Sequence, residues 1–140
     1  MTFIFLSQSF YDDYQGCFEI EQKADRPYIR ACMEINGVIF AVPLRSNINH
    51  PHVLWTNEEK HCGIDFSKTV VLTKDSYIDY SRKPHIRQVE FDILRGKEHI
   101  LQQHLIKYIH AYKKAKKRLD VPRNRRLCEY STLQYFEKYI

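Results

Sequence analysis

Three apolar runs along the chain have the length and composition of β-strands. They cover residues 3–6 (FIFL), 28–44 (YIRACMEINGVIFAVPL) and 69–73 (TVVLT). β-Branched and aromatic residues favour strands because their side chains pack well on a pleated surface. Within 28–44, Asn36–Gly37 separates two apolar halves, and this dipeptide favours the tight turn of a β-hairpin. The sequence therefore predicts a hairpin whose second strand ends in the polar stretch RSNINHPH at 45–52.

A helical period replaces this pattern from about Gln88 onward. Apolar side chains recur there at alternating steps of four and three residues, which places them on one face of a long helix: Leu101, Leu105, Tyr108, Tyr112, Ala115 and Leu119. Gly96 marks either the start of this helix or a bend in it. Asp120-Val-Pro122 closes it, because proline cannot continue a helix.

Two shorter helices are expected elsewhere in the chain. Ser7 is a suitable N-cap for a short helix within residues 7–22. A last helix is predicted to begin at Ser131, because Ser-Thr-Leu-Gln matches a capping box. Helices and a small antiparallel sheet together predict an α+β fold.

Length and composition fit a single domain over residues 1–140. The chain is 44% hydrophobic, which suffices for one buried core, and it contains no linker-like or repetitive segment. No run approaches the ~20 apolar residues that span a bilayer, and the first residues lack a signal-peptide pattern. The expected location is therefore the cytoplasm, with no membrane partner. The four scattered cysteines favour reduced thiols.

Charge is distributed unevenly along the chain. Residues 1–80 carry a net charge of −4, whereas residues 81–140 carry +9. A cationic surface of this size attracts polyanions, and nucleic acid is the leading candidate. The alternative interpretation is a set of solvated lysine-rich helix faces. The candidate RNA-binding residues are His52, Lys68, Lys107, Lys113, Lys114, Lys116, Lys117, Arg118, Arg123, Arg125 and Arg126.

The polar stretch after the predicted hairpin holds candidate catalytic residues. Cutting RNA without a metal requires a base near the 2′-hydroxyl, an acid near the leaving oxygen, and positive charge around the phosphate. Arginine binds phosphate through a fixed fork of donors, and histidine suits either proton-transfer role at neutral pH. Arg45, Ser46, His50 and His52 supply these groups within eight residues. Arg26 precedes the first strand of the hairpin and is expected near its open end.

A metal site is the weaker interpretation of the same region. His50, His52, His61 and Cys62 are zinc ligands by residue type. Their spacing is unusual, however, and adjacent ligands strain a tetrahedral site, so neither a metal nor another cofactor is expected. The sequence also lacks the motifs of P-loop enzymes, dinucleotide-binding proteins, zincins and α/β-hydrolases.

The segment RPYIRACMEINGVIFAVPLRSNINH resembles the ToxN/AbiQ toxins of type III toxin–antitoxin systems, including their CptN and TenpN relatives. The family pattern runs from Lys or Arg through an apolar strand and a polar-glycine hairpin to Pro-Leu, a polar residue and serine. CGIDFSKTVVLTKD and the long basic helix also resemble parts of the family, so the resemblance covers most of the chain. Only the first segment is at all specific.

This resemblance implies a fold and an activity. The fold would be a compact, strongly curved antiparallel sheet related to the barrel of the MazF/Kid toxins and elaborated by helices. The activity would be metal-independent endoribonuclease cleavage of adenine-rich single-stranded RNA, leaving a 2′,3′-cyclic phosphate. The partners would be target mRNA and a small repeat RNA antitoxin, folded as a pseudoknot, which closes with the protein into a cyclic assembly.

The family's functional positions can be transferred to this chain where its pattern matches. The lysine before the first strand falls on Arg26, and the serine after Pro-Leu falls on Ser46. The N-terminal tyrosine falls near Tyr11, although Phe10 beside it leaves the register open. The family threonine becomes Arg45, and the lysine two residues beyond the serine becomes Ile48.

These departures leave the acid and base unassigned by the family pattern. Arg45 is expected to replace the lost positive charge, and we nominate His50 as the proton-transfer group, with His52 and Lys68 as weaker candidates. The resulting hypothesis is an RNA-cleaving toxin in which Arg26 and Arg45 neutralise the scissile phosphate and Ser46 orients it. The chief alternative is a non-catalytic RNA-binding protein, and a metal-dependent nuclease or structural zinc protein is the third interpretation.

Overall fold

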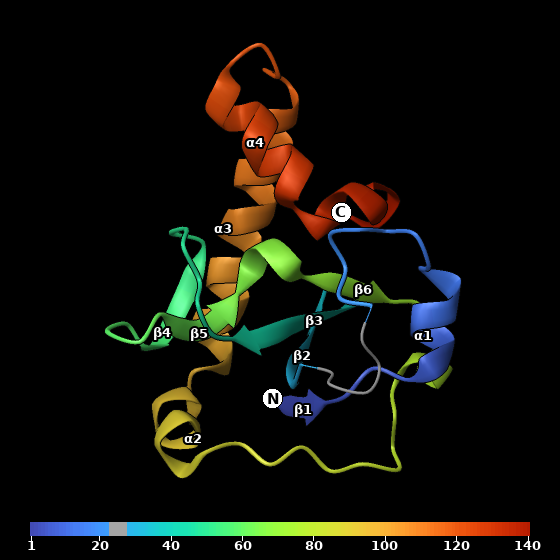
Figure 1. The fold of residues 1–140 in the computed structure, drawn as a ribbon, viewed down its shortest axis with the longest axis vertical. Coiled ribbons are helices and arrows are strands. Elements are labelled where there is room, and N and C mark those ends of the chain that lie inside the picture. Colours follow the sequence, from blue (N-terminus) through green and yellow to red (C-terminus); the bar gives the residue numbers. More distant parts are fainter. Residues whose placement is uncertain (23–27) are drawn as a thin grey trace.

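Six antiparallel strands form one open sheet in the computed structural model, which describes residues 1–22 and 28–140 (Figure 1). The strands are β1 (Thr2–Ile4), β2 (Arg30–Ile35), β3 (Val38–Arg45), β4 (Val53–Asn57), β5 (Cys62–Asp65) and β6 (Val70–Leu72). Their order is β1-β2-β3-β5-β4, and β6 also pairs with β3. The described strands therefore confirm an α+β fold, but they are not closed into the expected barrel.

The predicted hairpin is confirmed at Asn36–Gly37. β2 and β3 pair in continuous register from Arg30 opposite Pro43 to Ile35 opposite Val38. Asn36 and Gly37 have φ angles of 51° and 81°. A two-residue turn with two positive φ angles matches the right-handed twist of the flanking strands, and Asn-Gly adopts it readily.

The far end of β3 determines where the polar loop at 46–52 starts. One edge of β3 pairs with β2, and its other edge pairs first with β6 and then with β5. Arg45 lies opposite Gly63 in β5. Asp65 is two residues further along β5, so Arg45 and Asp65 share one face as diagonal neighbours.

The described residues also form four α-helices: α1 (Gln8–Asp13), α2 (Gln88–Leu94), α3 (Glu98–Lys116) and α4 (Pro122–Tyr130). Gly96 separates α2 from α3 with a φ of 73°, a left-handed conformation that glycine adopts without strain. The predicted stripe on α3 is buried from Leu101 to Ala115. Leu119 is the exception, since it lies beyond the end of α3 and is 41% exposed.

The ends of the predicted helices differ in detail from the structure. Pro122 does not only follow α3. It is also the first residue of α4, a helix that was not predicted from the sequence. At this position the missing N–H of proline costs no hydrogen bond. Ser131 caps a 3-10 turn, Thr132–Tyr135, by accepting a hydrogen bond from the N–H of Leu133. Ser7 precedes α1 as predicted, but its hydroxyl donates to the carbonyl of Ser76 instead of capping the helix.

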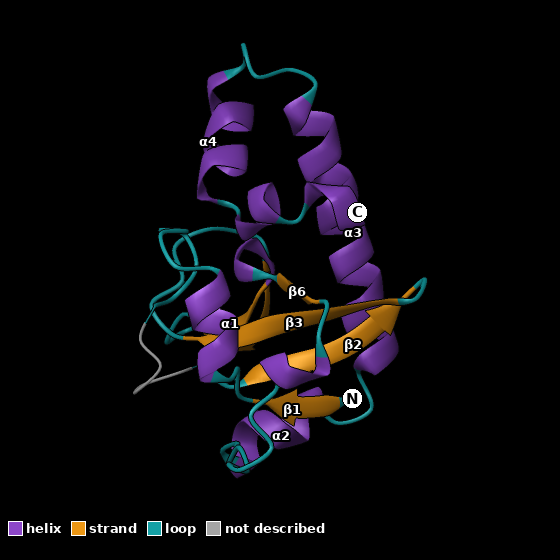
Figure 2. Cartoon of the chain, turned by 90° about the vertical axis from the view of Figure 1, so that its right-hand side faces the viewer, coloured by secondary structure: helices purple, strands orange, loops and turns teal. Residues whose placement is uncertain are grey.

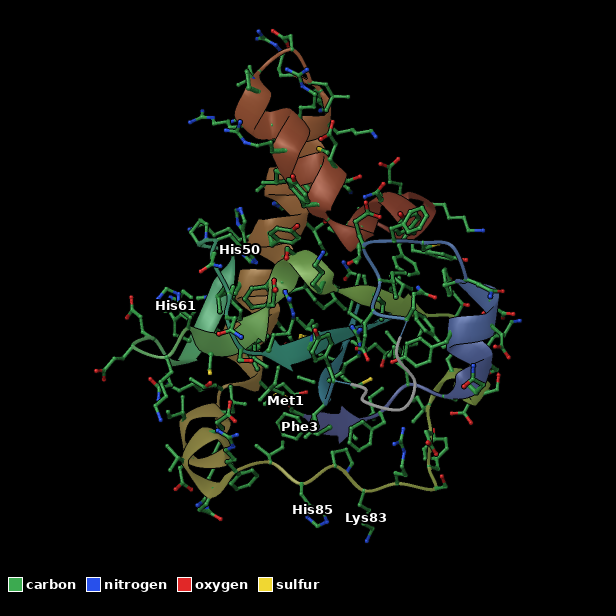
Figure 3. All side chains as sticks on the ribbon, in the orientation of Figure 1. Met1, Phe3, His50, His61, Lys83 and His85 are labelled. Carbon is green, nitrogen blue, oxygen red and sulfur yellow. The ribbon has the colours of Figure 1, made fainter. Side chains whose placement is uncertain are left out.

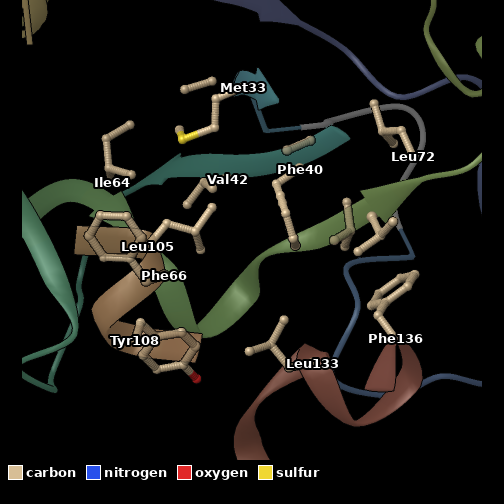
Figure 4. Close-up of a cluster of buried hydrophobic side chains, with 14 of the residues drawn as sticks. Met33, Phe40, Val42, Ile64, Phe66, Leu72, Leu105, Tyr108, Leu133 and Phe136 are labelled. Atoms are coloured by element: carbon tan, nitrogen blue, oxygen red, sulfur yellow. The ribbon is translucent and has the colours of Figure 1, made fainter. Parts of the chain in front are cut away.

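The core lies between the sheet and the apolar stripe of α3. Leu105 and Tyr108 pack with Val42, Ile64 and Phe66 in this cluster (Figure 4). Beyond the core, α3 and α4 continue side by side as a helical hairpin that rises above the sheet (Figure 2). No helix among the described residues is both long and apolar enough to cross a membrane.

Candidate functional site

A fully buried carboxylate, that of Asp65, organises the polar groups at the end of β5. Its side chain is 0% exposed. Asp65 also caps the 3-10 turn Phe66–Lys68, because its Oδ1 accepts hydrogen bonds from the N–H and the hydroxyl of Ser67 at 2.9 and 2.6 Å. A buried carboxylate remains charged only where donors replace its hydration. Burial would raise the pKa of Asp65, yet hydrogen bonds from His50, Ser67 and Arg45 hold that pKa at about 2.

Arg45 supplies the positive partner of this carboxylate. Its Nη1 donates to Oδ2 of Asp65 at 2.5 Å, and its guanidinium lies 5.5 Å from the ring centroid of Tyr28. Burial alone would lower the pKa of Arg45, but the hydrogen bonds with Asp65 and Tyr28 outweigh it and raise that pKa. Since about a quarter of the side chain is exposed, the remaining N–H groups of the guanidinium can reach a phosphate.

His50 is held between this carboxylate and its own loop. Its Nε2 lies 3.0 Å from Oδ1 of Asp65 and 3.1 Å from the hydroxyl of Ser67. Its Nδ1 accepts a hydrogen bond from the backbone N–H of His52 at 3.1 Å. Nδ1 is thus the acceptor and Nε2 carries the proton in the neutral ring. Both ring nitrogens are occupied, which fits a positioning role better than proton transfer.

His52 is better suited to proton transfer than His50. Its ring centroid lies 5.6 Å from that of His50 and 5.2 Å from that of Tyr108. Neither ring nitrogen of His52 has a hydrogen-bond partner among the described residues. Burial and the neighbouring His50 lower the pKa of His52, against a smaller opposing effect of Asp65. His52 is therefore a neutral imidazole at pH 7, able to accept a proton.

The loop that carries both histidines is anchored at several points. Ile48 is 1% exposed and fixes the middle of the loop in the protein. Its N–H donates to the carbonyl of His61 at 3.1 Å, and Nδ1 of His61 donates to the carbonyl of Ile48 at 2.9 Å. The N–H of Phe66 donates to the carbonyl of His52. Figure 3 shows His50 and His61 together on one side of the molecule, away from Met1 and Phe3.

A groove of about 1050 Å³ extends from this site along the α3–α4 hairpin. Arg45, His50, His52 and Ser67 line the end of the groove at the sheet. The helices add four cations and two tyrosines: Lys114, Arg118, Arg123, Arg126, Tyr108 and Tyr130. Its lining, drawn from the described residues, includes no Asp or Glu side chain. Such a groove suits a polyanion with flat aromatic groups, since arginine and lysine bind phosphates and exposed aromatic rings stack on bases.

A second cavity of about 430 Å³ lies on the other side of Arg45. Lys68 and Tyr28 line it, but so do Glu19 and Glu21. Burial and the charge of Arg45 lower the pKa of Lys68, whose Nζ donates to the carbonyl of Tyr130 at 3.0 Å. The two carboxylates repel a nucleic-acid backbone, so the groove along the helices is the better RNA site.

Two predicted catalytic residues among the described ones do not join this site, and nothing is described for a third. Arg26 lies outside the described residues. Ser46 is exposed at the end of β3 and does not line the groove. Tyr11 does not line the groove either, because α1 turns this ring into the core, where it is 4% exposed. Burial and the charge of Glu21 raise the pKa of Tyr11 to about 12, so it holds its proton at neutral pH.

The predicted basic residues divide into two groups. Lys114, Arg118, Arg123 and Arg126 line the groove, although Arg118 also pairs with Asp120 at 2.9 Å. The others lie elsewhere: Lys68 borders the second cavity, Lys116 pairs with Glu137 at 3.2 Å, and Lys107, Lys113, Lys117 and Arg125 are exposed outside the groove. The proposed zinc ligands do not converge either, as the described residues include no metal-binding group of three His, Cys, Asp or Glu side chains.

Sequence reasoning missed Asp65, Ser67 and Tyr130. The spacing Asp-x-Ser was the available signal for the first two, because a side chain of this type often accepts a hydrogen bond from the backbone two residues later. Comparisons of the chain with protein-family models, with curated proteins and with solved structures gave no match. The interpretation of the site therefore depends on its own geometry.

Proposed function

We propose that this protein is a metal-independent endoribonuclease that acts as the toxin of a type III toxin–antitoxin system. The observation that supports this most directly is the placement of an arginine and two histidines at one end of a cationic groove whose described lining residues include no carboxylate. Cleavage would be by attack of the RNA 2′-hydroxyl on the adjacent phosphate, which forms a 2′,3′-cyclic phosphate and breaks the bond to the 5′-oxygen, and that oxygen leaves as a 5′-hydroxyl after taking a proton from water. The same proposal includes a fold related to that of the MazF/Kid toxins, although the sheet is open.

Each group at this end of the groove has a role in the proposed reaction. Arg45 donates to the scissile phosphate and stabilises the charge that grows on its oxygens in the transition state. His52, neutral and free of hydrogen bonds among the described residues, accepts the proton of the 2′-hydroxyl. His50 and Asp65 are positioning residues, since their contacts fix the loop and the guanidinium. This assignment gives proton transfer to His52 instead of the nominated His50.

The groove along the helices is the proposed site for both target mRNA and the RNA antitoxin. A small repeat RNA folded as a pseudoknot would fill it, prevent substrate from entering and close with the protein into a cyclic assembly. The backbone of either RNA would contact the cations of α3 and α4, in particular Lys114, Arg123 and Arg126.

Incubation of the purified protein with an adenine-rich single-stranded RNA in excess EDTA tests this proposal. The expected result is a set of discrete new ends whose 3′ termini are cyclic phosphates. The alternative is a non-catalytic RNA-binding protein, which the contacts at both ring nitrogens of His50 favour. Such a protein would shift the RNA in a gel without producing new ends. Cutting that disappears with EDTA would indicate a metal-dependent nuclease and contradict the proposal.

A further inference from the structure

Tyr130 presents an unpaired aromatic ring to the groove. It is the last residue of α4 and its side chain is 65% exposed, although tyrosine is usually half-buried or more. Within the described part of the chain, neither its ring nor its hydroxyl has an aromatic or hydrogen-bonding partner. Tyr130 nevertheless lines the same groove as Arg45 and His52.

The backbone under this ring is tied to the candidate active site. Nζ of Lys68 donates to the carbonyl of Tyr130 at 3.0 Å, and the hydroxyl of Thr132 donates to the carbonyl of Ser67 at 3.2 Å. The neighbouring Ser131 accepts a hydrogen bond from the hydroxyl of Tyr108 at 2.8 Å. Ser67 in turn contacts both His50 and Asp65. Tyr130 is therefore held at a fixed distance from the proposed phosphate site.

The cations beside this ring lie on the same face of α4. Arg123 and Arg126 precede Tyr130 by seven and four residues, a spacing that places all three side chains on one side of the helix. All three line the groove, whereas Arg125 and Glu129 do not. An exposed ring beside phosphate-binding arginines is the arrangement used to bind single-stranded nucleic acid, where bases stack while the backbone follows positive charge.

We propose that Tyr130 stacks on an unpaired nucleobase next to the phosphate bound at Arg45. This inference deepens the proposed function and depends on it, because it identifies how the same groove selects single-stranded RNA. A base in a duplex has both faces covered by its neighbours, so only an unstacked base can cover this ring. The ring contacts the uncharged base and not the charged phosphate, so the strength of this contact is independent of salt.

Binding of a fluorescent single-stranded RNA with every 2′-hydroxyl methylated tests the proposal without any cutting. Tyr130→Leu should weaken this binding by about 5-fold to 100-fold, whereas Tyr130→Phe should stay within about 2-fold, because stacking needs only the ring. Tyr80→Leu is the matched control, since Tyr80 is 70% exposed but does not line the groove. All three variants should keep the wild-type unfolding temperature.

The slope of log affinity against log salt separates stacking from charge. Tyr130→Leu should leave this slope unchanged, while Arg126→Gln should reduce it. Replacing one nucleotide at a time by an abasic residue should identify a position at which wild type and Tyr130→Leu bind equally, as expected when the stacked base is gone.

The outcomes distinguish this inference from the proposed function. Equal binding by wild type and Tyr130→Leu, or an equal loss in Tyr80→Leu, would overturn the stacking role even if the protein cuts RNA. A selective loss in Tyr130→Leu would support it even if no cutting is detected, in which case only the catalytic proposal fails. Absence of RNA binding by the wild-type protein would contradict both.

Discussion

Nη1 of Arg45 donates to Oδ2 of Asp65 at 2.5 Å, and the carboxylate that it binds is fully buried. The two residues are twenty positions apart in the sequence and meet because β3 and β5 pair with Arg45 opposite Gly63. This ion pair fixes the cation of the proposed phosphate site, and the same carboxylate fixes His50. The geometry of the site therefore depends on Asp65.

Asp65→Asn should lower the free energy of unfolding by about 3 kcal/mol, because it leaves Arg45 without its buried partner charge. Ser67→Ala is the matched control. It removes one neutral donor to Asp65 and should cost only about 1 kcal/mol. Urea unfolding measures both values. An Asp65→Asn protein as stable as wild type would show that the ion pair does not contribute to stability.

The same carboxylate predicts how stability depends on pH. The pKa of Asp65 is lowered from 3.8 to about 2 in the folded protein, so the folded state favours the charged form more than the unfolded chain does. Its contribution is complete above pH 3.8 and is lost as pH falls from 3.8 to about 2. Between about pH 5 and about pH 2, wild type should lose about 2 kcal/mol more stability than Asp65→Asn. Parallel pH curves for the two proteins would contradict the assigned pKa.

The pH dependence of RNA cutting tests the assignment of the base. The pKa of His52 is lowered from 6.5 by burial and by His50, so its neutral form should predominate above pH 6.5. The cutting rate should therefore rise with pH with a midpoint below pH 6.5 and reach a plateau by about pH 7.5. A rate that still increases steeply above pH 8 would indicate a different base.

The two sides of α4 provide a matched pair of charge reversals. Arg126 lines the groove, whereas the adjacent Arg125 is exposed outside it. Arg126→Glu should weaken RNA binding and reduce the salt slope by about 1, while Arg125→Glu, with the same change of net charge, should have a much smaller effect. Affinity measured at several salt concentrations decides this. Equal effects of the two substitutions would show that the helices attract RNA only through their overall charge.

Gly63 allows β4 to approach β5 closely enough to complete the site. A Cβ at this position would lie 2.4 Å from the carbonyl oxygen of Leu54 and 2.7 Å from Cγ1 of Val53. Gly63→Ala should therefore destabilise the protein by about 1–3 kcal/mol, as expected for overpacking. Cys62→Ala, at the neighbouring half-buried position, should cost less. Thermal unfolding of both variants measures the difference, and a Gly63→Ala protein with the wild-type unfolding temperature would contradict this packing.

Local patterns in the sequence predicted the parts of the fold that depend on neighbouring residues. Asn36–Gly37 predicted the hairpin because its turn conformation is encoded in two residues. The helical spacing of apolar residues predicted the buried stripe of α3, because this spacing is also a feature of neighbouring residues. β4 and β5 were missed because they are short strands between polar residues, and their positions are determined by tertiary pairing, β5 with β3 and β4 with β5.

The candidate site was predictable only in part. Arg45, His50 and His52 were identified because they are close in the sequence and have suitable chemistry. Asp65 and Tyr130 were missed because they reach the site through tertiary packing from β5 and α4. Tyr11 came from a family position whose register was open, and it lies in the core instead of lining the groove.

The cutting rate of the His52→Gln protein is the most direct measurement of the central claim. A labelled single-stranded RNA is incubated with excess protein in EDTA, and the rate is compared among wild type, His52→Gln and His85→Gln. His85 is exposed and does not line the groove, and Figure 3 shows it at the opposite end of the sheet region from His50. The account predicts a loss of about 100-fold or more for His52→Gln and the wild-type rate for His85→Gln. A His52→Gln protein that cuts as fast as wild type would contradict it.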